Sequence, residues 1–226
     1  MNEWAEREIA FFGKINAGIS HELKNVLAII RESSGLMEDI MSISPEAVVS
    51  YQDKFRTSLG KIKDQIKRGV ELTDRLNKFA HSTDKAITKI DLHKTIEQFV
   101  GLSQRFARLK NVTLDTDPPE PSVQPVIIET HLVQLQMALF TAIECCLNAM
   151  SSGGIINLFL GKRKEANAVH ILCKGDLPGK PEFGDNLSEL EIWPSLQELA
   201  AALKGSVEID ESLSGIVLFL PDEISG

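Results

Sequence analysis

The feature that most constrains this chain is a long stretch without proline in which apolar residues recur at alternating steps of three and four. It runs from about Trp4 to Met41. This spacing places apolar side chains on one face of an α-helix, and that face must pack against another helix. The residues on it are Phe12, Ile15, Ile19, Leu23, Val26, Ile30, Met37 and Ile40.

A second helix with the same kind of face is predicted after a short break. Ser44, Pro45 and Glu46 are typical of a helix start, with a capping serine, a proline at the first helical position and an acid in the first turn. The apolar pattern continues to about Ala80, and a short turn makes two long helices antiparallel neighbours. Because one hairpin leaves much apolar surface uncovered, we predict a homodimer in which two hairpins form a four-helix bundle.

The pattern changes after a polar break at residues 81–84. We expect helices near 92–109, 129–150 and 196–203, and strands near 112–115, 125–128, 155–160, 168–174, 206–210 and 215–221, with a loop between 174 and 196. Strands mixed with helices in this way indicate an α+β fold. The predicted domains are a dimerisation hairpin over 1–84 and an α/β sandwich over 85–226.

Composition narrows the classes of function. The net charge of −8 argues against a general affinity for nucleic acid or anionic membranes. The N-terminus lacks the pattern of a signal peptide and no apolar run is long enough to span a bilayer, so we expect no membrane insertion. Cys145, Cys146 and Cys173 have no disulfide or metal-site spacing. A cytoplasmic location is the simplest expectation.

His21 is the residue that points most clearly to chemistry. On a helical wheel at about 100° per residue, it lies about 160° from the apolar face of the first helix and is therefore exposed. A neutral imidazole is nucleophilic at physiological pH and can accept a phosphoryl group. Glu22 could take the ring proton or fix its tautomer, and Asn25, one turn on, could orient a water molecule. The alternative interpretation is an ordinary solvated histidine.

The segment from Ile19 to Ile30, ISHELKNVLAII, resembles the phosphoacceptor motif of two-component sensor histidine kinases. Residues 72–80, LTDRLNKFA, look like the end of the second dimerisation helix of that family. The resemblance implies that His21 is the phosphoacceptor, Glu22 its acid/base partner, and Glu22 with Asn25 the family's phosphatase signature. The departure is Val26, where the family usually has a proline that kinks the helix.

The second half resembles the kinases' ATP-binding domain in its order of elements, but its nucleotide motifs differ. Aligned on Ala149 and Met150, the magnesium-binding asparagine falls on Cys145, and a rival register uses Asn148. Lys174 occupies the position of the adenine-binding aspartate, with Asp176 two residues late. Trp193, Pro194 and Ser195 stand where a glycine-rich segment should cover the phosphates. The resemblance therefore predicts a kinase-like fold that has lost ATP binding.

Together these observations predict a histidine phosphotransfer protein that passes a phosphoryl group, through His21, to or from aspartates of response-regulator receiver domains. The chain would need no cofactor of its own, because the receiver supplies the magnesium. Three alternatives stay open. They are an ATP-dependent histidine kinase with a divergent site, a non-catalytic regulator that binds a kinase or receiver, and a phosphatase acting through Glu22 and Asn25.

Overall fold

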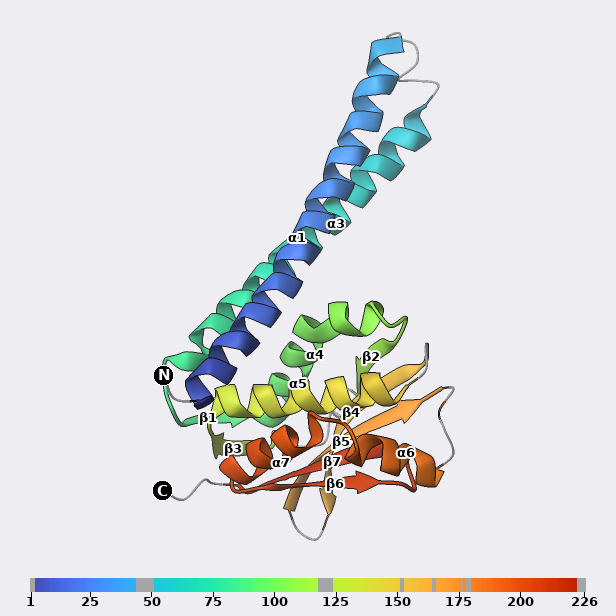
Figure 1. Cartoon of the computed structure of the whole chain (residues 1–226). Helices are drawn as coiled ribbons and strands as arrows, with labels where there is room; N and C mark the ends of the chain where they lie inside the picture. The colour runs from blue at the N-terminus through green and yellow to red at the C-terminus, as the bar shows by residue number, and fades with distance from the viewer. Residues whose placement is uncertain are drawn as a thin grey trace. The chain divides into compact units, whose positions relative to one another are not determined.

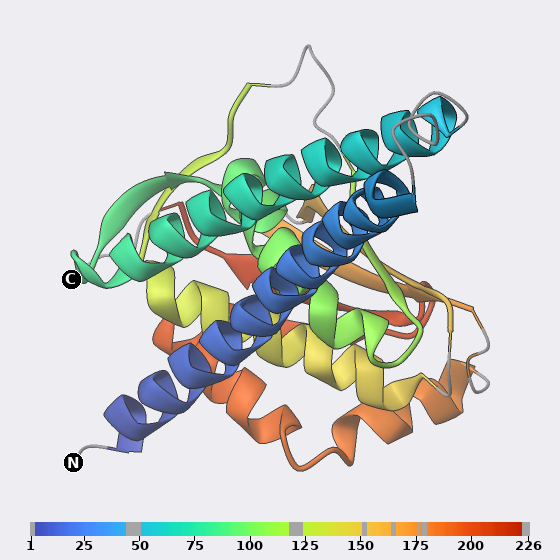
Figure 2. The same cartoon turned by 90° about the horizontal axis from the view of Figure 1, so that it is seen from above.

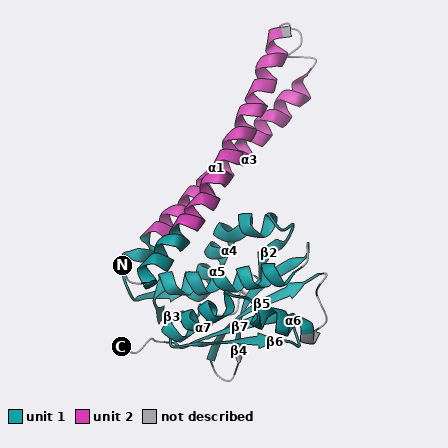
Figure 3. Cartoon of the chain, viewed as in Figure 1, with its two compact units in different colours: residues 1–12, 81–226 teal, residues 13–80 magenta. Residues whose placement is uncertain are grey.

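The computed structural model describes residues 3–43, 51–117, 124–150, 153–163, 166–175, 177 and 180–222. The chain divides into two compact units, residues 13–80 and residues 1–12 together with 81–226 (Figure 3). The domains expected from the sequence, 1–84 and 85–226, placed the first twelve residues with the hairpin. In the structure these residues group with residues 81–226.

The unit of residues 13–80 is a helical hairpin. It consists of most of α1 (Glu3–Ile43) and of α3 (Gln52–Ala80), which lie side by side and run in opposite directions (Figures 1 and 2). Ile15, Ile19 and Val26 of the predicted apolar face of α1 are buried. On α3 the predicted face includes Leu59, Ile66 and Val70, which are exposed, while the buried Leu72 lies outside it. The predicted helix start at 44–46 lies outside the described residues. A second copy of the hairpin, needed for a four-helix bundle, remains a prediction.

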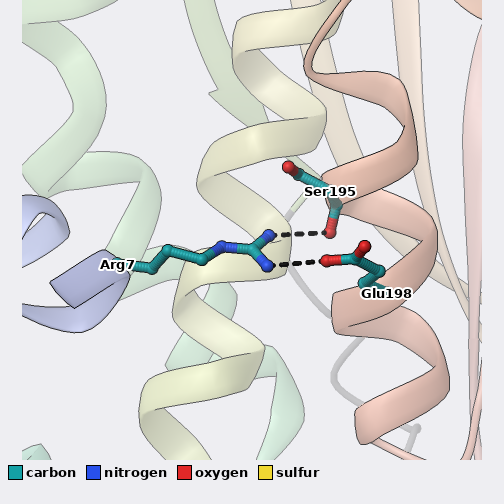
Figure 4. A network of polar contacts seen from close by, with 3 residues as sticks. All are labelled: Arg7, Ser195 and Glu198. Carbon is teal, nitrogen blue, oxygen red and sulfur yellow. Dashed lines mark hydrogen bonds and ion pairs between the residues drawn. The ribbon is translucent and has the colours of Figure 1, made fainter. Parts of the chain in front are cut away.

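The first turns of α1 pack within the other unit. The ring of Phe11 lies 5.7 Å from that of Phe140 and 6.2 Å from that of Phe99, measured between centroids. Figure 4 shows Arg7 reaching α7, where its guanidinium donates to the Glu198 carboxylate at 2.6 Å and to the backbone carbonyl of Ser195 at 3.5 Å. Residues 3–12 therefore supply core and surface contacts to the sandwich.

The remainder of this unit is an α/β sandwich, with helices over one face of a sheet (Figure 1). Its elements are η1 (His81–Thr83), β1 (Thr88–Asp91), α4 (Leu92–Arg108), β2 (Thr113–Thr116), β3 (Ile127–Thr130), α5 (Leu132–Ala149), β4 (Ile155–Arg163), β5 (Ala166–Lys174), α6 (Lys180–Ser188), α7 (Trp193–Ala202), β6 (Ser206–Asp210) and β7 (Gly215–Leu220). The five-stranded sheet has the order β2-β4-β5-β7-β6, and β1 pairs with β3 in a separate ladder. Only the β2–β4 pair of these ladders is parallel. The predicted α+β fold class, a helical hairpin followed by an α/β sandwich, is confirmed.

The core of the sandwich centres on α5. Twelve of its eighteen residues are buried. This helix is apolar and long enough to cross a membrane by composition, but its burial inside the unit is that of a core helix. The side chain of Asp91 caps the start of α4 by accepting a hydrogen bond from the Lys94 amide. The buried residues of α5 therefore form the centre of the core, and the cap stabilises the first turn of α4.

Two elements of the sandwich differ from the sequence-based expectation. The segment between β5 and α7 was expected to be a loop, but it contains α6. Phe183 and Leu187, four residues apart on α6, are fully buried, which explains why this segment folds into a helix. The short strand β1, which the sequence analysis did not identify, pairs antiparallel with β3 from Thr88–Thr130 to Asp91–Ile127.

Candidate functional site

The residues predicted to carry chemistry lie on α1, within the hairpin. His21 and Asn25 are exposed, as the helical wheel indicates, whereas Glu22 is buried, with its side chain only 7% exposed. Because His21 and Asn25 are four residues apart on a continuous helix, their side chains leave the same face one turn apart. Helical hydrogen bonds already hold the backbone at His21 rigid. Binding a partner at the imidazole therefore costs little conformational entropy of the backbone.

The buried carboxylate of Glu22 is held from the opposite helix. Arg68 of α3 donates through Nη2 to Oε2 of Glu22 at 2.5 Å, although the two residues are 46 positions apart in the sequence. The Arg68 side chain is 36% exposed, so it connects the interior of the hairpin to its surface. Sequence reasoning missed Arg68, because nothing in α3 taken alone shows which of its basic residues faces Glu22.

The two helices approach closely beside this ion pair. A Cβ placed on Gly69 would lie 3.4 Å from Cγ1 of Val26, which is already van der Waals contact. Val26 is buried at the position where a resembling kinase would have proline. Valine keeps its backbone amide for the helix, and α1 runs unbroken from Glu3 to Ile43. The histidine therefore sits on a helix that no proline interrupts.

The two positions that can align with the magnesium-binding asparagine, Cys145 and Asn148, differ in exposure. Cys145 is fully buried, and burial raises the pKa of its thiol to about 12, with a further contribution from the charge of Glu144. A side chain inside the core cannot face a nucleotide. Asn148, the rival register, is exposed and accepts a hydrogen bond from Nζ of Lys110 at 3.4 Å. Of the two registers, the one with Asn148 therefore places the aligned side chain at the surface.

The later nucleotide motifs have other roles here. Lys174 ends β5 and is exposed, while Asp176 lies outside the described residues. Trp193 is buried at the start of α7, and Pro194, at the second residue of that helix, has no amide hydrogen to offer an anion. The segment that would form a lid over ATP instead contains α6, whose Phe183 and Leu187 are part of the core.

A resident metal site was not expected. Within the described ranges, no three His, Cys, Asp or Glu side chains come together in a way that could hold an ion. The three cysteines are buried as free thiols. The Cys173 thiol beside Cys146, together with burial, raises the pKa of Cys146 well above its usual value. These groups act as core residues.

Comparison with known proteins supports the predicted family resemblance. The chain is 23% identical over 176 residues to sporulation kinase A of Bacillus subtilis (strain 168), an alignment that covers 77% of this chain and 26% of that protein. The chain thus spans about a quarter of this relative. No family model matches. The predicted resemblance to two-component sensor histidine kinases is confirmed by this alignment.

Several solved structures are distantly similar. They include histidine kinase AdeS of Acinetobacter baumannii, with 13% identity over 89% of this chain and 98% of that one, at a TM-score of 0.44. A bacterial phosphotransferase has 14% identity over 93% of this chain and 95% of that one, also at a TM-score of 0.44. The catalytic domain of histidine kinase ThkA has 18% identity over 62% of this chain and all of that one, at 0.42. These likenesses are too distant to add to the fold described above.

Proposed function

We propose that this chain is a histidine phosphotransfer protein of a two-component relay, in which His21 accepts a phosphoryl group from one response-regulator aspartate and donates it to another. The observation that carries the proposal is the exposed His21 on a continuous helix, beside a buried carboxylate that a cross-helix arginine holds. The similarity to a sporulation kinase supports the same signalling class.

The transfer needs few groups from this chain. A ring nitrogen of His21 attacks the phosphorus of an aspartyl phosphate, the new P–N bond forms, the P–O bond breaks, and the aspartate leaves as a carboxylate. The proton on the other ring nitrogen passes to Glu22. The receiver domain holds the magnesium that neutralises the phosphoryl oxygens. Donation to a second receiver is the reverse of these steps.

Phosphotransfer is a better proposal than ATP-dependent autophosphorylation because of the second unit. Lys174 replaces the aspartate that would read adenine, and Pro194 lacks an amide at the helix start where phosphates would bind. Helix α6 occupies the segment of the lid. Of the aligned positions, Asn148 alone has the expected type of side chain, an amide, at the surface. One remaining amide is insufficient for a site that needs adenine, phosphate and magnesium contacts.

Receiver docking and dimerisation both fall on the hairpin under this proposal. On α3, Leu59, Ile66 and Val70 are 46%, 52% and 56% exposed and lie on one face of the helix, so a second hairpin would cover them. Residues 13–80 contain more Lys and Arg than Asp and Glu, although the whole chain has a net charge of −8. A hairpin with this charge suits the acidic pocket of a receiver domain.

The proposal is tested in two steps. Wild type and His21→Ala are first incubated with radiolabelled ATP and magnesium, and acid-labile phosphate is measured. We expect no label on either protein, and label on wild type alone would identify a kinase. Receiver domains from the same genome, phosphorylated with radiolabelled acetyl phosphate, are then offered to both proteins. Label that moves to wild type but not to His21→Ala supports phosphotransfer, and a failure of every receiver contradicts it.

A further inference from the structure

The ion pair between Arg68 and Glu22 is the feature of the hairpin that the proposed function leaves unexplained. Its two members come from different helices, α1 and α3, and their side-chain atoms approach to 2.5 Å. The Glu22 side chain is 7% exposed, and Glu22 is the one charged residue that is buried among those described. A carboxylate in this position requires a partner, because an unpaired buried charge is strongly unfavourable.

Stability alone does not account for this pair. Replacing a buried ion pair with apolar side chains of similar volume is commonly neutral or stabilising, because the desolvation of two charges is avoided. A leucine at position 22 would suit the packed interior next to Val26. The chain instead keeps a carboxylate here, immediately after the exposed His21, and adds a charged residue on the other helix to hold it.

We infer that Arg68 is a positioning residue for the chemistry at His21: its guanidinium fixes the Glu22 carboxylate as the acceptor of the imidazole proton. This rests on the proposed function and extends it to the second helix of the hairpin. The planar guanidinium fixes the direction of the carboxylate as well as its charge. Gly69, the next residue, lies where α3 approaches Val26 of α1, so the two helices are close to each other beside the ion pair. The site is therefore built from both helices.

The reaction with potassium phosphoramidate tests this inference without any receiver. The His21 ring nitrogen bonds to phosphorus, the P–N bond of phosphoramidate breaks, and ammonia leaves after taking a proton. Glu22 accepts the proton lost from the imidazole. Mass spectrometry gives the rate of phosphorylation at His21 in wild type, Glu22→Gln, Arg68→Gln, Arg68→Lys and the Glu22→Gln/Arg68→Gln double variant. Arg56→Gln is the matched control, because Arg56 is an exposed arginine of the same helix.

We expect Arg68→Gln to lower the rate about tenfold or more, since loss of orientation and of proton acceptance each reach that size. Arg68→Lys should recover part of the rate, and Arg56→Gln should match wild type. The double variant should react as slowly as Glu22→Gln alone, because Arg68 acts through Glu22. Circular dichroism at the assay temperature confirms that each variant is folded.

Two results would overturn the inference. One is a wild-type rate for Arg68→Gln. The other is a rate loss from Arg68→Gln that is equally large with Glu22 present and with Glu22→Gln, which would assign Arg68 a role independent of the carboxylate. The proposed function fails separately, if no phosphorylated receiver transfers to His21. In that case the phosphoramidate rates still decide the role of Arg68.

Discussion

The packing of residues 1–12 within the sandwich unit leads to a quantitative prediction about Phe11. Its side chain is 6% exposed and its ring contacts those of Phe99 and Phe140. Truncating a buried phenylalanine to alanine commonly costs about 3 kcal/mol or slightly more. If unfolding of this unit has a urea dependence of about 2 kcal/mol per M, Phe11→Ala should lower its urea midpoint by about 1.5 M.

Tryptophan fluorescence makes the measurement specific to this unit. The chain has two tryptophans, Trp4 and Trp193, and both belong to it. Ile9→Ala is the control, because Ile9 lies on the same turns of α1 but is 62% exposed. It should change the free energy of unfolding by less than about 0.5 kcal/mol.

A double-mutant cycle separates the ring contact from general destabilisation. Phe11→Leu and Phe140→Leu keep most of the apolar volume, and their coupling free energy should be about 1 kcal/mol. A shift of the Phe11→Ala midpoint no larger than that of Ile9→Ala would refute the packing of residues 1–12 on the sandwich. Strict additivity of the two leucine variants would refute the direct contact between the rings.

Three further predictions concern other parts of the chain. The Cys145 thiol has a pKa of about 12 in the fold against 9.0 ordinarily, so between these values only the unfolded state loses its proton. The stability from this group is complete below pH 9 and should fall by about 1.4 kcal/mol per pH unit above it, as urea unfolding of wild type and Cys145→Ala at pH 8 and 10 would test. Gly205→Ala should lower the thermal midpoint markedly, because its Cβ would collide with the carbonyl oxygen of Phe219, and calorimetry would detect this. Asn25→Ala should abolish any dephosphorylation of a receiver while sparing transfer to His21, as release of inorganic phosphate would reveal.

Much of the fold follows from local patterns in the sequence. The apolar periodicity predicts both helices of the hairpin, and the runs of apolar residues predict β4, β5 and β7. Helix α6 was missed because its sequence, KPEFGDNLS, contains proline and glycine and has low helical propensity. It forms because Phe183 and Leu187 are buried in the core, and no local pattern reports that packing.

The candidate site divides in the same way. The helical wheel places His21 and Asn25 at the surface, but it cannot identify a residue on another helix. Arg68 could be paired with Glu22 only once the register of α3 against α1 was visible. The alignment of the second half also left two registers open. The structure distinguishes them, because Cys145 is buried and Asn148 is exposed. The role of each site residue stays a prediction until the transfer experiments are done.

The order of strands has a consequence for how the chain acquires its fold during synthesis. In the sheet, β7 lies between β5 and β6, yet both of those strands precede it in the sequence. Chains grow at roughly 5–20 residues per second, so β5 leaves the ribosome seconds before its neighbour exists. During that interval the edge of β5 that later pairs with β7 is open, and an open apolar edge invites pairing with other chains. A nascent chain that stops before Leu220 would therefore be an aggregation hazard rather than a shorter version of the same domain.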